Sequence, residues 1–264
     1  MSLLKARIKS SPSKALLWTT IGFWGGFCGV SLYGPLVPMF AESMSLSPLY
    51  LALMAAFPLL SGSLLRIPFG AMVDKTGGKK PFLILLGTSI VGLGGLLVFL
   101  YFIPKPSSVY YSLILFLGFL GGAGVATFSV GISQTAYWFP MKEQGKALGT
   151  YAGLGNTAAG FFAGMLPALF LAIGMLGAYG VWLVVLVVLT IGYGLFVQDA
   201  PYFQLKKQGL IADQRTLADL GQELIPSGSI QRSLKIAALK PPTWGLVILY
   251  FTSFGGALAL TVWF

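Results

Sequence analysis

The sequence contains seven long stretches that are almost free of charged residues. About 20 apolar residues in an α-helix cross the roughly 30 Å of hydrocarbon in a bilayer, and each stretch reaches that length. Because no water satisfies backbone groups inside a bilayer, each stretch is predicted to be helical. The predicted fold class is therefore an all-α polytopic membrane protein, with spans at residues 15–40, 48–73, 81–103, 110–139, 147–174, 176–198 and 243–264.

The composition supports this class and excludes several functions. Only 9% of the 264 residues are charged and the mean hydropathy is +0.84, whereas a soluble domain has about 25% charged residues. The apolar runs are continuous, which excludes an outer-membrane barrel with its alternating strands. With one cysteine and no histidine, the chain has no internal disulfide and no imidazole chemistry. Acids and metal ligands do not cluster, so we expect no cofactor, no metal and no enzymatic activity.

The net charge of +10 is distributed as in a membrane protein. If the loops alternate across the bilayer, fifteen of the 17 basic residues fall on one side, Lys105 falls on the other, and Arg66 lies in a span. Basic loops face the cytoplasm, so the N-terminus is predicted to be cytoplasmic, in the plasma (inner) membrane. No arginine-rich stripe with interleaved aromatic residues is present, which argues against a nucleic-acid partner.

The loop lengths predict four regions. Residues 1–14 form a cytoplasmic tail, 15–198 a six-helix bundle, 199–242 a polar cytoplasmic linker, and 243–264 a seventh helix. Within the linker, Ser229 is a candidate N-cap of a basic amphipathic helix. That helix would lie on the inner leaflet, or alternatively form a solvated linker.

Arg66 is the only charge that we place inside a span. An arginine there costs roughly 2.5–3.5 kcal/mol on insertion scales, so a partner or a water-filled cavity is expected. Pro58, Gly62, Arg66 and Gly70 are spaced four apart and share one helix face. Two interpretations remain open, an anion-binding residue or half of a structural ion pair. The absence of any carboxylate within a span favours anion binding.

The loop GAMVDKTGGKKP, residues 70–81, resembles the loop between helices two and three of the major facilitator superfamily. That loop usually reads G-x-x-x-D-R-x-G-R-R/K, and Lys75 replaces its first arginine. An acid at Asp74 can accept hydrogen bonds from a neighbouring helix N-terminus, although an ordinary basic loop is the alternative. The motif residues, expected to act in gating, are Gly70, Asp74, Lys75, Gly77, Lys79 and Lys80.

This resemblance implies a fold of two six-helix halves with the substrate site between them. The chain would then supply the first half and one helix of the second. We therefore expect it to be a fragment that needs a missing C-terminal half to complete its site.

Span five has a glycine-rich face with a single amide, Asn156, in it. Small residues at three- and four-residue spacing allow helices to pack closely, which is the ordinary interpretation. Asn156 could also donate hydrogen bonds to an oxyanion. The residues that we assign to helix packing are Gly149, Gly153, Gly155, Gly160 and Gly164.

The chain most resembles the nitrate/nitrite porters of the major facilitator superfamily. The resemblance rests on RIPFG in span two, GAGVATFSVGISQTAYWFP in span four, GLGN in span five and LYFTSFGG in span seven. It implies uptake or exchange of nitrate or nitrite by alternating access. Ala158 departs from the family's frequent GNxG pattern. The implied substrate-binding residues are Arg66, Phe128, Asn156, Tyr250 and Phe254.

Other functions are also compatible with these residues. Arg66 would equally serve a carrier of another small anion, such as cyanate or a short carboxylate, or the chain could be an inactive fragment that keeps only the fold. A multipass enzyme is disfavoured, because acids and metal ligands do not cluster at the membrane face. Since the acidic residues fall in loops or at span ends and histidine is absent, anion exchange fits better than proton symport.

Overall fold

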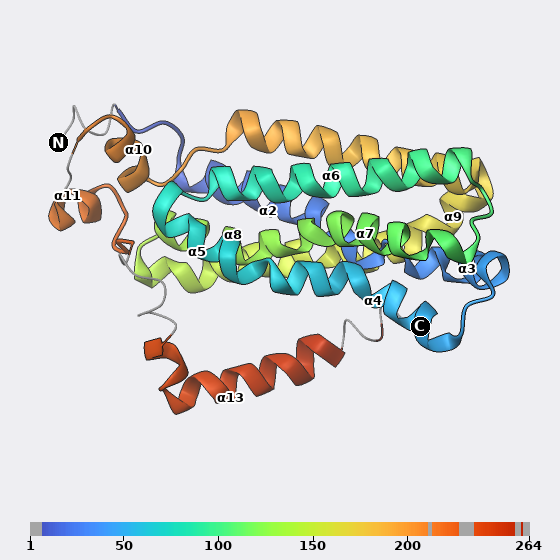
Figure 1. Ribbon diagram of the computed structural model, residues 1–264. Helices are drawn as coiled ribbons and strands as arrows, with labels where there is room; N and C mark the ends of the chain where they lie inside the picture. Colours follow the sequence, from blue (N-terminus) through green and yellow to red (C-terminus); the bar gives the residue numbers. More distant parts are fainter. Residues whose placement is uncertain (1–6, 211–212, 227–234, 257–259, 261–264) are drawn as a thin grey trace.

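The computed structural model describes residues 7–210, 213–226, 235–256 and 260. These residues form long helices that run side by side in a bundle, and no β-strand occurs among them (Figure 1). Five helical stretches are long and apolar enough to cross a membrane. The predicted class, an all-α polytopic membrane protein, is confirmed.

The first two spans are each made of more than one helical segment. α2 (Pro12–Phe27) begins after Ser11, whose hydroxyl accepts the Lys14 N–H, and two short 3₁₀ turns lead from it to α3 (Val37–Met44). The second span consists of α4 (Pro48–Leu64) and α5 (Arg66–Thr76), which meet at Leu65. Arg66 therefore stands at the first position of α5.

The third and fourth spans follow the predicted boundaries closely. α6 (Lys79–Phe102) forms the third span. The fourth comprises α7 (Tyr111–Gly121), the 3₁₀ segment η4 (Gly122–Ala126) and α8 (Thr127–Trp138). η4 lies in the glycine-rich part of the sequence, and this tight segment places Phe128 on the first turn of α8.

α9 (Met141–Phe196) contains both the fifth and the sixth predicted spans. Its backbone breaks at Gly174, where φ is 73° and ψ is 169°. Glycine adopts this conformation without the steric cost that a side chain adds. The break falls where the predicted spans 147–174 and 176–198 meet, and the chain turns back along the bundle there (Figure 1).

Beyond α9 the chain forms short helices at one end of the bundle. α10 (Pro201–Lys207) and α11 (Gln214–Asp219) lie near the N-terminal tail (Figure 1). Gln204 joins α10 to this tail, since its side chain accepts the Lys9 N–H at 2.8 Å and donates to the Lys9 carbonyl at 2.9 Å. The proposed amphipathic helix from Ser229 lies largely outside the described residues.

The last described helix, α13 (Pro241–Tyr250), lies along one side of the bundle and continues into a π-helical turn, Phe251–Gly255 (Figure 1). Residues 257–259 and 261–264 of the predicted seventh span are outside the description. That span, and the division at residues 14, 198 and 242, remain predictions.

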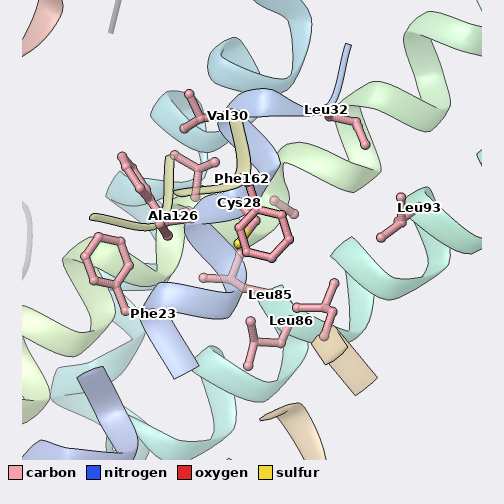
Figure 2. Packing of buried hydrophobic residues seen from close by; sticks show 14 of the residues in the cluster. Phe23, Cys28, Val30, Leu32, Leu85, Leu86, Leu93, Ala126 and Phe162 are labelled. Carbon is pink, nitrogen blue, oxygen red and sulfur yellow. The ribbon is translucent and has the colours of Figure 1, made fainter. Parts of the chain in front are cut away.

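The core is apolar and lies where α2, α6, η4 and α9 meet. Figure 2 shows Cys28 surrounded by aromatic and aliphatic side chains, from these elements and from the 3₁₀ turn that follows α2. Cys28 is fully buried, and its thiol donates to the Trp24 carbonyl. Residues labelled there include Phe23, Val30, Leu32, Leu85, Leu86, Leu93, Ala126 and Phe162.

α4 and η4 are in backbone contact. A Cβ added at Gly122 would lie 2.1 Å from the Pro58 carbonyl oxygen. No side chain fits in that space, so only glycine permits the two segments to approach this closely. The contact holds the second span against the fourth, and it brings α5 beside α8.

Candidate functional site

The Arg66 side chain lies against the aromatic rings of two other spans. Its Cζ is 5.1 Å from the centre of the Phe128 ring and 6.0 Å from the centre of the Phe254 ring. Both distances are in the range of cation–π interactions. The site therefore joins α5, α8 and the π-helical turn after α13, which are far apart in the sequence.

The helix face predicted around Arg66 is directed at the fourth span. Gly62 lies against Val125, and Gly70 lies against Ser129 at an ordinary van der Waals distance. The Pro58–Gly122 and Arg66–Phe128 contacts belong to the same series. Successive turns of the second span therefore contact successive turns of the fourth. The small residues on this face allow the guanidinium to point into the bundle rather than into lipid.

Phe128, Tyr250 and Phe254 form a stack. The ring centres of Tyr250 and Phe254 are 4.8 Å apart with an interplanar angle of 19°. The Phe128 ring lies 6.5 Å from Tyr250 and 6.4 Å from Phe254, at angles of 20° and 15°. Three nearly parallel aromatic rings therefore lie beside the guanidinium.

A second aromatic layer supports Phe128 from behind. Phe23 packs on it with ring centres 5.3 Å apart, and Tyr151 stacks on it at 6.3 Å and 23°. The Tyr151 hydroxyl donates to the carbonyls of Thr127 and Phe128, at 3.0 and 3.2 Å. These contacts hold the backbone of Phe128 as well as its ring.

Gly155 makes room for this layer. A Cβ at Gly155 would lie 2.0 Å from Phe23, so any side chain would displace the Phe23 ring from Phe128. Neither Phe23 nor Tyr151 was predicted from the sequence to belong to the site. Tyr151 stands one helical turn before Gly155 in the TYAGLGN run, and an aromatic residue in a glycine-rich helix face was the signal that could have identified it.

The other glycines of span five have no such contact. Added Cβ atoms at Gly149, Gly153, Gly160 and Gly164 would meet nothing within 4 Å, and all four residues are exposed. Their packing role remains a prediction, since their face is open in this structure.

The charge of Arg66 is not neutralised within the described part of the chain. Its Nε is buried without a hydrogen-bond partner, and the one ion pair among the described residues joins Lys207 to Asp199. Leaving a buried donor unpaired costs about 1–3 kcal/mol, and more for a charged group. This side chain is therefore suited to an external anion.

Asn156 has a different environment from the one expected. Its amide nitrogen donates to the Ala152 carbonyl of its own helix at 2.7 Å. Its Oδ1 is buried and has no partner among the described residues. A donor role toward an oxyanion would require this local bond to open, and that role remains a prediction.

The loop motif at residues 70–81 places its acid against a side chain. An acid at Asp74 can accept hydrogen bonds from a helix N-terminus, but its Oδ1 accepts the Tyr137 hydroxyl of α8 at 2.7 Å. Asp199 takes the expected place instead, because its Oδ1 accepts the Lys79 N–H at the start of α6, at 2.8 Å. Spatial folding, not sequence proximity, decides which carboxylate meets the helix dipole.

Gly77 is the loop residue that packs directly against the Asp199 carboxylate. Its φ is +83°, and an added Cβ would lie 2.4 Å from the Asp199 carboxylate. Asp199 is almost fully buried and also binds the Lys207 ammonium at 2.6 Å. The loop motif is thus tied to the end of the sixth span and to α10.

A cavity of about 1050 Å³ lies elsewhere, between α2 and α9. Its lining includes Leu16, Trp24, Lys146 and Leu154, and it does not include Arg66. In the part of the chain that the structure describes, no three His, Cys, Asp or Glu side chains come together as metal ligands would.

The fold and this site define a multi-pass helical membrane protein that holds an arginine inside its bundle against aromatic rings. The chain belongs to the Major Facilitator Superfamily, whose family model matches residues 19–264.

Similar proteins carry names that agree with the expected resemblance. The probable nitrate transporter NarT of Staphylococcus carnosus is 30% identical over 183 residues, covering 69% of this chain and 45% of the relative. The probable nitrate/nitrite transporter NarK2 of Mycobacterium tuberculosis is 29% identical over 244 residues, covering 92% of this chain and 54% of the relative. A probable nitrate/nitrite antiporter, NarK1 of Thermus thermophilus, is 31% identical over 174 residues, covering 65% and 37%.

The chain thus spans about half the length of the curated relatives it matches. The resemblance to the nitrate/nitrite porters predicted from the sequence is confirmed by these relatives.

Replacing Gly77 tests the loop geometry. Gly77→Ala should destabilise the protein by about 1–3 kcal/mol, because alanine is strained at this φ and meets the Asp199 carboxylate. Thermal unfolding of the purified chain in detergent measures the change. The matched control is Gly87→Ala, at a helical position with nothing within 4 Å. Equal melting temperatures for the two variants would contradict the proposed fit.

Proposed function

We propose that this chain forms one half of the substrate site of a secondary transporter for a small inorganic oxyanion, nitrate or nitrite. The anion would be taken up or exchanged by alternating access between two six-helix units. One observation carries the proposal: the Arg66 guanidinium lies against Phe128 and Phe254 with a buried Nε, and among the described residues this Nε has no partner and no carboxylate pairs with the side chain.

The shape of the site matches a planar anion. A guanidinium presents parallel N–H donors in one plane, and it binds trigonal oxyanions with two bonds at once. The nearly parallel rings of Phe128, Tyr250 and Phe254 lie beside this guanidinium. A flat anion can lie along the face of an aromatic ring, whereas a tetrahedral anion needs more depth.

The choice of nitrate or nitrite rests on the relatives, which are named as probable nitrate or nitrate/nitrite transporters. On this proposal the chain resides in the inner membrane with its N-terminus in the cytoplasm. A second six-helix unit would complete the site and would cover the open glycine face of α9.

The exchange of Arg66 for lysine tests the anion site. Arg66→Lys keeps the charge but loses the planar fork, so nitrate affinity should fall about tenfold or more. Nitrate-dependent thermal stabilisation of the chain, copurified with a polypeptide that supplies the second half, measures affinity, and nitrite, cyanate, acetate and sulfate test selectivity. Arg7→Lys, the same exchange on an exposed arginine, is the control. Unchanged nitrate affinity in Arg66→Lys would disprove the assignment.

Tyr151 is expected to position Phe128 rather than contact the anion. Tyr151→Phe removes the hydrogen bonds to Thr127 and Phe128, which should cost about 1 kcal/mol of stability and weaken nitrate binding severalfold. The control is Tyr179→Phe, which removes a comparable buried bond to the Leu32 carbonyl. Both variants should lose stability, but only Tyr151→Phe should lose nitrate affinity. Equal nitrate affinities in the two variants would refute the positioning role.

The placement of the acids predicts anion exchange. All seven acidic residues are described, and they lie in loops or near helix ends rather than beside Arg66. Vesicles holding the chain together with a polypeptide that supplies the second half should therefore take up nitrate faster when loaded with nitrite. We expect little flux from the chain alone. Uptake that requires a proton gradient and ignores internal nitrite would favour symport instead.

A further inference from the structure

A second basic site lies at the end of the bundle where α6 begins. A pocket of about 410 Å³ is located there, between the first turn of α6 and the segment that leads into α10. It is separate from the Arg66 site, and although Lys79 and Lys80 belong to the loop motif, no ligand was assigned to them from the sequence. Its lining consists of Lys79, Lys80, Leu83, Ile84, Asp199 and Lys207.

The pocket carries an excess of positive charge. Three lysines surround one carboxylate, and both oxygens of Asp199 are already engaged, by the Lys79 N–H and by the Lys207 ammonium. Within the described ranges, the ammonium groups of Lys79 and Lys80 form no ion pair. The N-terminus of α6 adds the positive end of a 24-residue helix dipole. An anion is the ligand that this pocket would attract.

The pocket opens onto an apolar stripe on α6. Ile84, Val91 and Val98 are spaced seven apart, on one side of the helix, and their side chains are 39%, 61% and 59% exposed. Gly87 lies between them and faces open space. Exposed apolar side chains of a membrane-spanning helix meet the acyl chains of lipids. A phospholipid has a charged headgroup and apolar acyl chains, so a basic pocket next to an apolar stripe is complementary to it.

We propose that this pocket binds the headgroup of an anionic phospholipid, with an acyl chain along Ile84, Val91 and Val98. The headgroup phosphate contacts the Lys79 and Lys80 ammonium groups. Basic pockets between membrane helices are known places for such headgroups. Because Lys207 and Asp199 also line the pocket, the lipid would join the start of α6 to α10. The inference is independent of the proposed transport function.

Local lipid composition can be measured at the stripe. Gly87→Cys places a fluorophore-labelled thiol just below the pocket without altering its lining, and Val98→Cys places one at the far end of the same stripe. The native Cys28 is fully buried and stays unlabelled. The chain is reconstituted into vesicles of zwitterionic and anionic phospholipid, in about a four-to-one ratio. A spin label on one lipid or the other quenches the fluorescence.

The anionic lipid should be enriched about threefold at Gly87→Cys relative to Val98→Cys. The enrichment should disappear in Lys79→Gln/Lys80→Gln and persist in Lys75→Gln/Lys142→Gln, a matched pair outside the pocket. Equal enrichment at both positions, or enrichment that survives loss of Lys79 and Lys80, would overturn the proposal. Displacement by inorganic phosphate, but not by chloride at equal ionic strength, would identify a free-phosphate site and would also overturn it.

Discussion

The guanidinium of Arg66 inside an apolar bundle is the constraint on which the candidate site depends. A charge in hydrocarbon is costly unless it meets a partner, water or an aromatic face. Here it lies against Phe128 and Phe254, and its Nε has no partner in the described structure. The interaction with the rings lowers this cost only in part. The remaining cost is what an external anion could offset.

Small residues make that arrangement possible. The contact between Pro58 and Gly122 brings the second span onto the fourth, and it aligns Arg66 with Phe128. Behind Phe128, Gly155 admits Phe23, and Tyr151 holds the local backbone through two carbonyls. Close backbone approach and aromatic packing thus act together, because each glycine removes volume that an aromatic ring or a neighbouring helix then occupies.

One end of the bundle is organised by a different principle. The buried carboxylate of Asp199 meets the start of α6, the Gly77 turn and the Lys207 ammonium. Gln204 adds the N-terminal tail to the same assembly through its hydrogen bonds with Lys9. Hydrogen bonds and charges therefore connect the loops, whereas apolar contacts and glycine packing hold the spans. The basic pocket beside Asp199 belongs to this polar assembly.

Much of the fold was predictable because the bilayer imposes a simple rule on the sequence. Apolar length determines where helices run, so the expected spans agree with the helices from α2 through α9, including the turn at Gly174. Arg66 was identifiable for the same reason, since a lone charge in an apolar run has a high cost. The superfamily followed from the loop motif and from the glycine-rich runs.

Only the tertiary structure decided the contacts between spans that lie far apart in the chain. Sequence spacing places residues on a helix face but does not say which face another helix brings to it. Asp199 therefore accepts the N–H at the start of α6 while Asp74 accepts the Tyr137 hydroxyl. Tyr151 and Phe23 lie behind Phe128. Asn156 was engaged by its own helix. The sequence by itself determined the class, the spans from α2 through α9 and the charge placed among them, because these depend on transfer from water to lipid. Partner choice depends on packing in three dimensions.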